Sequence, residues 1–377
     1  MKYLEKRKIE AFIFLVLISA FFGVLAHYMG TRNMLSTIMT SAHELLLNTV
    51  FYLMSITVLA GAFGQLLIEF GVVRLLEMFF APLMRPLFRL PGVASLAALM
   101  TFFSDNPAII TLAEDKNFSS YFKRHELISL TNFGTAFGMG LIVITFMAGK
   151  GFFSASLVGF VGAIVGAMVS TRLMQYLIKD EELHKTYFPS IAKEEKIKLK
   201  SEGTIGLRFI NSILDGGKLG VDIGLSIIPG VLIISTLVML VTYGPIDPSV
   251  GYQGLAFEGV PILPKFASYF SWIFKALFGF QSPEAIAFPI TSLGSVGAAL
   301  SLIPSFLERG IIGANEIAVF TAMGMCWSGY LSTHTAMLDS LGYRELTSKA
   351  LLSHTIGGIV AGVVAHYGFL LFSVVLG

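Results

Sequence analysis

The sequence predicts an all-α membrane protein that crosses the bilayer several times. Of its 377 residues, 55% are hydrophobic and only 13% are charged, and the mean hydropathy is +0.77. Soluble domains carry about 25% charged residues. One residue pattern also recurs at a separation of 190 positions, aligning Ala108 with Ala298, Glu126 with Glu316 and Gly134 with Gly324. Each copy contains an apolar segment that is interrupted in its middle. These observations together predict a polytopic helical protein built from two related halves.

Apolar runs of roughly 20 residues are long enough to cross a bilayer as helices. The candidates are Ile9–Tyr28, Leu45–Ile68, Leu127–Met147, Phe152–Leu177, Leu219–Val241, Ile317–Leu338 and Ala350–Leu376. The first run follows a basic start, as a signal peptide would, but it is longer than the usual apolar region of about 7–15 residues. We therefore interpret Ile9–Tyr28 as a transmembrane helix.

Two further kinds of segment precede the later helices in each half. Val72–Leu90 mixes Arg74, Glu77 and other charges with large apolar residues, which predicts a helix lying in the membrane interface, and Phe266–Phe280 holds the matching place. The interrupted segments follow: Val93–Ala113 and Ala285–Phe306. Each is predicted to be a re-entrant helical hairpin that turns back at its interruption.

Each half then crosses the membrane three times, an odd number, so the two halves are predicted to be inverted relative to each other. The positive-inside rule supports a cytoplasmic N-terminus, because the predicted outer face holds only Arg32, Lys150, Lys265, Lys275 and Arg309. We expect a multi-pass protein of the cytoplasmic (inner) membrane. Its predicted parts are an N-terminal transmembrane helix (1–30), a first membrane repeat (43–178), a charged cytoplasmic linker (179–210) and a second, inverted repeat (211–377).

The first interruption holds the strongest local signal for a binding site. Proline favours the first position of a helix, and Asp or Asn before it caps free backbone amides, so Asp105-Asn106-Pro107 ends one half-helix and begins another. Ser104, Asp105 and Asn106 are candidate substrate-binding residues at membrane depth. The alternative is that Asp105 only caps the helix.

The other candidate substrate-binding residues lie in the second interruption and in the helices that follow each hairpin. They are Asn132, Thr135, Ser292, Ser295, Ser328, Ser332 and His334. Hydroxyl groups also bond back to their own helix, which is the alternative for each Ser and Thr. His334 is equally compatible with a structural role near the end of its helix. Glu126 and Glu316 are interpreted as acids that favour the first turn of a helix.

The residues present argue against several kinds of function. No phosphate-binding loop occurs, because Gly217-Lys218 is followed by Leu219, so no nucleotide motor is expected. One cysteine, Cys326, forms no metal cluster, and we expect no metal site, no cofactor and no enzymatic activity. The linker mixes acids with bases, so no nucleic-acid partner is expected. Without a motor, H⁺ or Na⁺ is the expected coupling ion, with Asp105 and Asp222 as candidate ligands.

The chain resembles the gate-domain, or nucleoside-recognition-domain, family of bacterial membrane proteins. The resemblance rests on Pro82–Ile144 and Ala276–Thr335, which each run from an interfacial helix through a small-residue hairpin into a glycine-bearing helix. That family is similar to concentrative nucleoside transporters, and the resemblance implies two hairpins that meet at a midplane site. The chain departs from those transporters in lacking Gln or Glu in the hairpins; Asp105 and Asn106 are the nearest polar pair.

We therefore expect a secondary active transporter of a small polar solute, nucleoside-like by resemblance, that works by alternating access. The alternatives are a gated ion or metal channel or permease, and a non-transporting scaffold or signalling protein. The expected partners are the solute and membrane lipids. The substrate, the direction of transport and the formation of a homo-oligomer are left open by the sequence.

Overall fold

The computed structural model describes residues 2–187 and 203–376. Within these ranges the chain is helical, and the only pairing of extended backbone is an isolated antiparallel bridge between Lys123 and Tyr187. Six helical segments in the described part are long and apolar enough to cross a membrane. The expectation of an all-α, multi-pass membrane protein is confirmed.

The first half of the chain follows the predicted order of elements, with short helices added near its end. Its elements are α1 (Lys2–Met29), α2 (Thr31–Glu44), the π-helical segment η1 (Leu45–Val50), α3 (Phe51–Glu69), α4 (Val72–Phe88), α5 (Ala94–Phe103), α6 (Pro107–Glu114), α7 (Lys116–Ser119), α8 (Arg124–Thr135), α9 (Gly140–Gly149), α10 (Phe153–Leu177) and α11 (Glu181–Lys185).

The second half repeats that order, with an irregular stretch before the interfacial helices. Its elements are α12 (Ile205–Ser226), the π-helical segment η2 (Gly230–Ser235), α13 (Thr236–Thr242), α14 (Ile262–Ser268), α15 (Ser271–Phe278), η3 (Pro283–Ile286), α16 (Ala287–Ser292), α17 (Val296–Leu300), α18 (Ile303–Glu308), α19 (Ala314–Cys326), α20 (Ser332–Ser340), η4 (Arg344–Leu346) and α21 (Thr347–Leu376).

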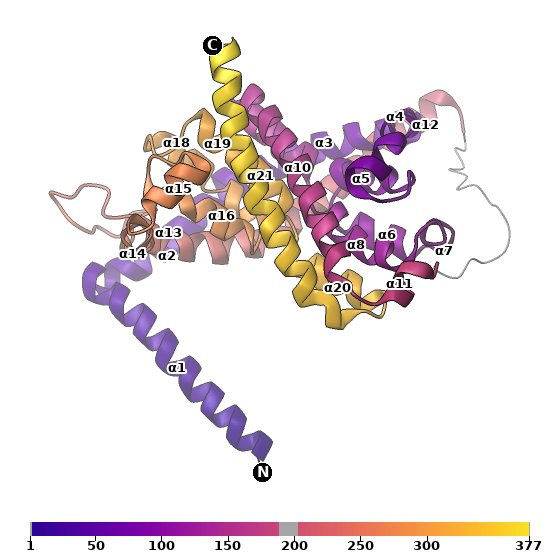
Figure 1. The fold of residues 1–377 in the computed structure, drawn as a ribbon. Coiled ribbons are helices and arrows are strands. Elements are labelled where there is room, and N and C mark those ends of the chain that lie inside the picture. Colours follow the sequence, from indigo (N-terminus) through magenta and orange to yellow (C-terminus); the bar gives the residue numbers. More distant parts are fainter. Residues whose placement is uncertain (1, 188–202, 377) are drawn as a thin grey trace.

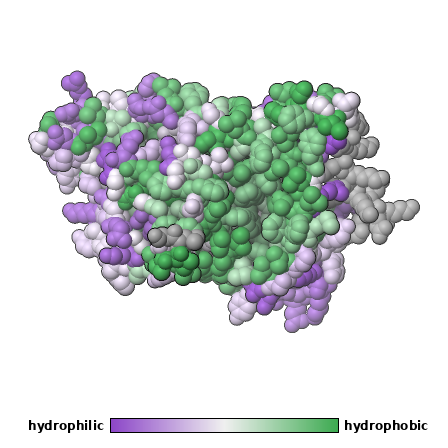
Figure 2. Space-filling model, turned by 90° about the horizontal axis from the view of Figure 1, so that it is seen from above, coloured by the Kyte–Doolittle hydropathy of each residue, from purple (hydrophilic) through white to green (hydrophobic). Residues whose placement is uncertain are grey.

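The helices α10 and α21 pack side by side through the middle of the molecule (Figure 1). The helices α4 to α8 lie on one side of this pair, and α14 to α16 with α18 lie on the other. The helix α1 extends away from the rest, and only its C-terminal part packs into a small apolar cluster with α2. The face of the molecule seen in Figure 2 is broadly apolar across its middle and upper right, with hydrophilic residues gathered at its left and lower right.

The repeat that was read from the sequence is confirmed in the backbone. The helices α8 and α19 begin at matching positions, Arg124 and Ala314, and each has a glutamate in its first turn that accepts a hydrogen bond from the residue before the helix. Glu126 Oε2 accepts from the Lys123 amide at 2.9 Å, and Glu316 Oε2 accepts from the Gly313 amide at 3.0 Å. The interpretation of both acids as first-turn residues agrees with these bonds.

The two helices predicted after the interrupted segments contain breaks that the sequence did not predict. The first, predicted over Leu127–Met147, lies within one candidate membrane span, Arg124–Gly149, but has a turn at 136–139 between α8 and α9. The second, predicted over Ile317–Leu338, is interrupted at 327–331 between α19 and α20. Met139 and Gly329 lie 190 positions apart and both have left-handed backbone, with φ of 55° and 85°. The apolar content of a segment indicates how long it is, but it does not reveal an interruption within it. Hydrogen bonds from neighbouring helices stabilise such an interruption.

Two predicted boundaries also shift. Helix α2 adds residues Thr31–Glu44 before the predicted Leu45–Ile68 span, and α12 begins at Ile205, inside the range predicted as linker. The rest of the predicted linker includes 188–202, which lie outside the described residues. The predicted interfacial segment Phe266–Phe280 forms two short helices, α14 and α15, rather than one.

The long helices α3 and α12 pack closely through small residues. A side chain on Gly220 would overlap the backbone of Thr57 and Val58, and one on Gly216 would overlap the carbonyl of Gly61. The hydroxyl of Thr57 donates to the Gly220 carbonyl at 2.6 Å. Small residues that bring two backbones together are a typical means of helix association in membranes.

Replacing Gly220 by valine is therefore expected to separate α3 from α12 and to lower the free energy of unfolding by about 1–3 kcal/mol, the usual cost of overpacking. Gly217 is a matched control on the same helix, because a Cβ there meets only Val58 Cγ1 at 3.8 Å. Thermal unfolding in detergent of Gly220→Val and Gly217→Val measures the difference. Equal midpoints for the two variants would contradict this account of the crossing.

Candidate functional site

The tip of the α5–α6 helix pair is polar and largely buried. Ser104 and Asp105 lie between the two helices, and Asn106 precedes Pro107, the first residue of α6. Asn106 is only 5% exposed. The Ser104 hydroxyl bonds back to the Met100 carbonyl at 2.5 Å, whereas Oδ1 of Asp105 and Oδ1 of Asn106 are buried without a hydrogen-bond partner. Two buried oxygens with unused acceptor capacity are expected where a ligand or cation binds.

Asn106 joins this tip to both interrupted helices. Its Nδ2 donates to the Ser328 carbonyl at 2.8 Å and lies 3.3 Å from the Ser328 hydroxyl. That hydroxyl in turn lies 3.0 Å from the Gly138 carbonyl and 3.3 Å from the Thr135 carbonyl. Both carbonyls are at the interruption between α8 and α9, where the regular helical bonds end. The sequence therefore identified Asn106 and Ser328 separately, and the structure brings them together.

Two glycines make this contact sterically possible. A Cβ on Gly138 would overlap Oδ1 of Asn106 and Oγ of Ser328, and a Cβ on Gly329 would overlap Oγ1 of Thr333 and lie close to Nδ2 of Asn106. Gly329 also has φ of +85°, which L residues rarely adopt. Sequence reasoning did not select these two positions. Gly138 and Gly329 lie at the two interruptions, which the sequence alone did not predict.

Asn132, Thr135 and His334 belong to a different polar group, centred on His354 of α21. The Cys326 carbonyl accepts a hydrogen bond from Nε2 of His354, so Nδ1 accepts from the Ser170 hydroxyl at 3.0 Å. The Ser170 hydroxyl accepts from Nδ2 of Asn132 at 3.0 Å, and the same Nδ2 also donates to the Ala350 carbonyl at 2.8 Å. We call Asn132, Ser170, Cys326 and His354 the His354 network.

The His354 network ties α8, α10, α19 and α21 together at full burial. Thr135 bonds back to the Thr131 carbonyl at 2.7 Å and approaches Nε2 of His354 at 3.4 Å. The His334 ring lies with its centroid 4.5 Å from that of His354, and neither ring nitrogen of His334 has a hydrogen-bond partner. His354 was missed as a site residue, although a histidine within an apolar span is itself a signal.

The second helix pair, α16 and α17, packs against η2 through Ser295. Ser295 caps α17 by accepting from the Ala298 amide at 3.3 Å, and it lies against Gly230. Ser235 in η2 donates to the Ala298 carbonyl at 3.0 Å. Ser292 only bonds back to the Pro289 carbonyl at 2.8 Å. None of these contacts joins Ser292 or Ser295 to Asn106, so the structure does not bring the two tips into direct hydrogen-bond contact.

Two remaining candidates lie on the surface of the described chain. Ser332 is exposed at the start of α20, and Asp222 is exposed on α12. Among the described residues no group of three or more His, Cys, Asp and Glu side chains is placed to hold a metal ion.

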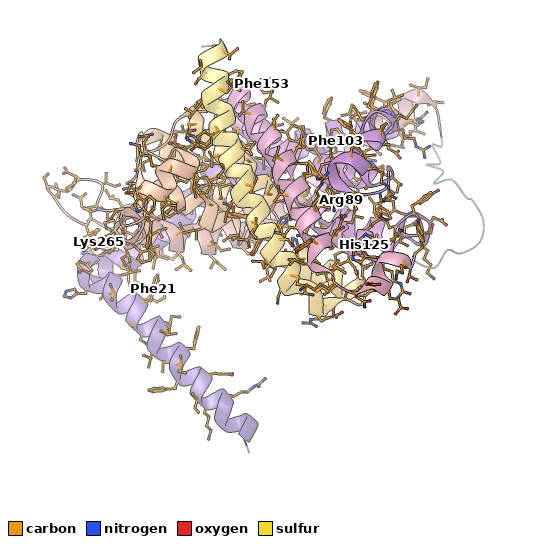
Figure 3. The ribbon with its side chains drawn as sticks, viewed as in Figure 1. Phe21, Arg89, Phe103, His125, Phe153 and Lys265 are labelled. Atoms are coloured by element: carbon orange, nitrogen blue, oxygen red, sulfur yellow. The ribbon has the colours of Figure 1, made fainter. Side chains whose placement is uncertain are left out.

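An apolar groove of about 340 Å³ lies beside the first helix pair, where Figure 3 labels Phe103. Its walls come from α4, α5, α8 and α10 and include Phe88, Phe102, Phe133 and Phe160. The only hydroxyl in its wall is that of Ser95, which is bonded to the Gly92 carbonyl at 2.8 Å. The groove therefore suits hydrocarbon rather than a polar solute.

The fold and this contact define a multi-pass helical membrane protein with paired interrupted helices. A model of the gate family, described as nucleoside recognition, matches residues 50–151, which contain α4, the first helix pair, α8 and α9. The resemblance to that family is confirmed over this stretch. An uncharacterized protein of Alkalihalophilus pseudofirmus is 25% identical over 319 residues, or 78% of this chain. The match spans about 60% of the length of that relative.

The whole fold is similar to that of solved structures of CNTnw, a concentrative nucleoside transporter. A CNTnw variant in an intermediate state has 12% sequence identity and a TM-score of 0.56, covering 95% of this chain and 85% of that one. A variant in an outward-facing state has 14% identity, a TM-score of 0.56 and coverage of 97% and 86%. CNTnw in an inward-facing substrate-bound state has 14% identity, a TM-score of 0.54 and coverage of 84% and 74%. At these identities the likeness establishes the fold.

Proposed function

We propose that this protein is a secondary active transporter that moves a small polar solute, nucleoside-like in character, through a site at the tip of the α5–α6 pair. The observation that most directly supports this proposal is the hydrogen bond between Asn106 and Ser328, which joins one half of the repeat to the other. Its support from outside the chain is the fold shared with CNTnw and the match to the nucleoside-recognition model.

In this proposal the two helix pairs are re-entrant hairpins, each half is inverted relative to the other, and the N-terminus is cytoplasmic. Oδ1 of Asp105 and Oδ1 of Asn106 accept a hydroxyl of the solute or bind the coupling cation, since both are buried and have acceptor capacity to spare. Carbonyls freed at the interruptions supply further oxygen ligands, as in other broken-helix transporters. Ser295 and the second hairpin close the site from the opposite side.

Alternating access requires the contact at Asn106 to form and break during transport. Two neutral hydrogen bonds are worth about 2 kcal/mol together, which is small enough to be exchanged for bonds to a solute. The His354 network has a different role in the proposal: it holds α8, α10, α19 and α21 together as one body that moves with the hairpins. The coupling ion is Na⁺ or H⁺.

Uptake by the full-length protein in proteoliposomes tests the proposal. A panel of radiolabelled nucleosides, nucleobases and amino acids is offered under an imposed Na⁺ or pH gradient. Saturable accumulation of a nucleoside above its outside concentration, lost on dissipating the gradient, is the expected result. Flux that only equilibrates the solute would identify a channel, and absence of flux for every solute would remove the support for transport.

Asn106→Ala is expected to lower this uptake roughly thirtyfold, because it removes about 2 kcal/mol of hydrogen bonding at the tip. Asn117→Ala is the matched control, since Asn117 is an exposed asparagine on the nearby helix α7. Asp105→Asn separates the two functions of the tip: loss of gradient dependence with residual equilibration would assign Asp105 to ion coupling. Unchanged uptake in Asn106→Ala would place the site elsewhere.

A further inference from the structure

A polar cavity that does not include the Asn106 tip lies where α4 ends and α8 begins. It has a volume of about 520 Å³. Its walls are formed by Arg85 and Arg89 at the end of α4, by Lys123, His125 and Glu126 at the start of α8, and by His184 of α11. Figure 3 labels Arg89 and His125, which lie on the same side of the molecule, between the ends of these helices.

The cavity carries an excess of positive charge. Three cationic side chains face one carboxylate, which leaves two positive charges with the histidines neutral. Glu126 is already engaged: Oε1 pairs with Nη1 of Arg85 at 2.5 Å, and Oε2 accepts the Lys123 amide. Within the described chain, no salt bridge reaches the guanidinium of Arg89 or the ammonium of Lys123.

The backbone of Arg89 adds an independent observation. Arg89 ends α4 with left-handed backbone, φ 57° and ψ 33°, whereas Gly279 ends α15 at the matching position with φ 72° and ψ 11°. Glycine is the usual residue in this conformation, and any other residue costs conformational energy there. The second half of the repeat has glycine at this position, whereas the arginine in the first half adopts the conformation at a backbone cost. Such strain is typical of positions whose side chain has a function.

The walls around Arg89 are held in place by hydrogen bonds that do not involve its guanidinium group. Nε of Arg172 donates to the Leu87 carbonyl at 2.7 Å, and Nε2 of Gln175 donates to the Phe88 carbonyl at 3.2 Å, which fixes the end of α4 to α10. The His125 and His184 rings stack with centroids 4.0 Å apart, and each ring bonds to a backbone carbonyl. These bonds hold the walls of the cavity in place, while Arg89 and Lys123 line it without a carboxylate partner among the described residues. The Lys123 ammonium lies 6.0 Å from the centroid of the Tyr187 ring.

We propose that this cavity binds a phosphate monoester. A phosphate monoester carries between one and a half and two negative charges at neutral pH, which matches the two uncompensated positive charges, whereas a carboxylate or phosphodiester carries only one. The guanidinium of Arg89 suits bidentate recognition of phosphate, and Lys123 supplies a point charge. The phosphate belongs either to a soluble compound or to a lipid with a monoester headgroup. This inference does not depend on the transport proposal.

Thermal unfolding of the purified full-length protein tests the proposal in two arms. In the soluble arm, glycerol 3-phosphate is titrated against sodium chloride at equal ionic strength. In the lipid arm, nanodiscs of phosphatidylcholine with phosphatidic acid are compared with nanodiscs containing phosphatidylglycerol, a phosphodiester. A saturable rise of the midpoint with glycerol 3-phosphate assigns a soluble ligand, and a rise confined to phosphatidic acid assigns a lipid.

Arg89→Gly gives the decisive variant, because it removes the charge while relieving the left-handed backbone. The variant is expected to be no less stable than the parent protein without ligand, yet to bind the phosphate compound about tenfold more weakly or worse. Lys123→Gln is expected to weaken binding likewise. Lys275→Gln, at the position of α15 that matches Arg85, is the control and should retain full binding. The proposal would be wrong if glycerol 3-phosphate raised the unfolding midpoint no more than sodium chloride does and phosphatidic acid no more than phosphatidylglycerol does. Unchanged binding in both Arg89→Gly and Lys123→Gln would also overturn it.

Discussion

Gly138→Ala is expected to lower solute uptake roughly tenfold or more while the protein stays folded. The added methyl group would occupy the space of Oδ1 of Asn106 and Oγ of Ser328, so these two side chains can no longer hold their present contact. The hydrogen bonds that would be lost are worth about 2 kcal/mol together, which corresponds to a factor of about 30. Uptake in proteoliposomes and thermal unfolding in detergent, measured on the same preparation, separate loss of function from loss of fold.

A double-mutant cycle shows whether this effect acts through Asn106. With Asn106→Ala already present, the alanine at 138 has less to collide with, so the double variant is expected to be about as active as Asn106→Ala alone. Gly149→Ala is the control in α9, because a Cβ there meets only the flexible end of Tyr52, at 3.0 Å. Independent, multiplying losses from the two substitutions would show that Gly138 acts by another route.

His354→Ala is expected to destabilise the protein by about 4 kcal/mol. The substitution leaves a cavity at a fully buried position and deprives Ser170 and Cys326 of their partners, and these two costs add. His43→Ala, at an exposed position, should change stability by no more than about 0.5 kcal/mol. Chemical unfolding in detergent micelles measures both.

His354→Phe distinguishes the two contributions. The phenyl ring fills most of the volume of the imidazole but makes no hydrogen bonds, so we expect roughly half the loss of the alanine variant. A phenylalanine variant as stable as the parent would mean that packing alone maintains this position, and the description of His354 as the centre of a hydrogen-bonded network would then be wrong.

Much of the architecture could be predicted from the sequence, for a physical reason. Hydrophobic content and run length report directly on whether a segment crosses a bilayer, because a polar backbone in hydrocarbon must satisfy its bonds within a helix. Glu126 and Glu316 mark the starts of α8 and α19, because each acts on the backbone within one turn of its own helix. Pro107 at the first position of α6 likewise gives the break between α5 and α6. The predicted capping is wrong, because the Asn106 side chain makes no capping bond to α6 and donates to the Ser328 carbonyl instead.

The site was predicted only in part, because its contacts join residues remote in sequence. Asn106 and Ser328 were both selected, but their bond spans 222 positions. Asn132, Thr135 and His334 were expected to bind substrate, yet the structure places them around His354, where Asn132 and Thr135 hydrogen-bond to the surrounding helices and their backbone. Asp222 was selected for ion coupling because it was expected to lie deep in the membrane, and it is exposed on α12. The substrate-binding and ion-coupling roles of these residues stay predictions.

By itself the sequence determined the class of protein, the repeat and the positions of the first-turn acids, since each of these depends on composition or on residues a turn apart. The tertiary structure alone decided that the helices after the hairpins are interrupted at 136–139 and 327–331, and that Arg89 ends α4 where glycine ends α15. An interruption leaves backbone groups without helical partners. Only neighbours brought in by folding, such as the hydroxyl of Ser328 on the Gly138 carbonyl, stabilise it.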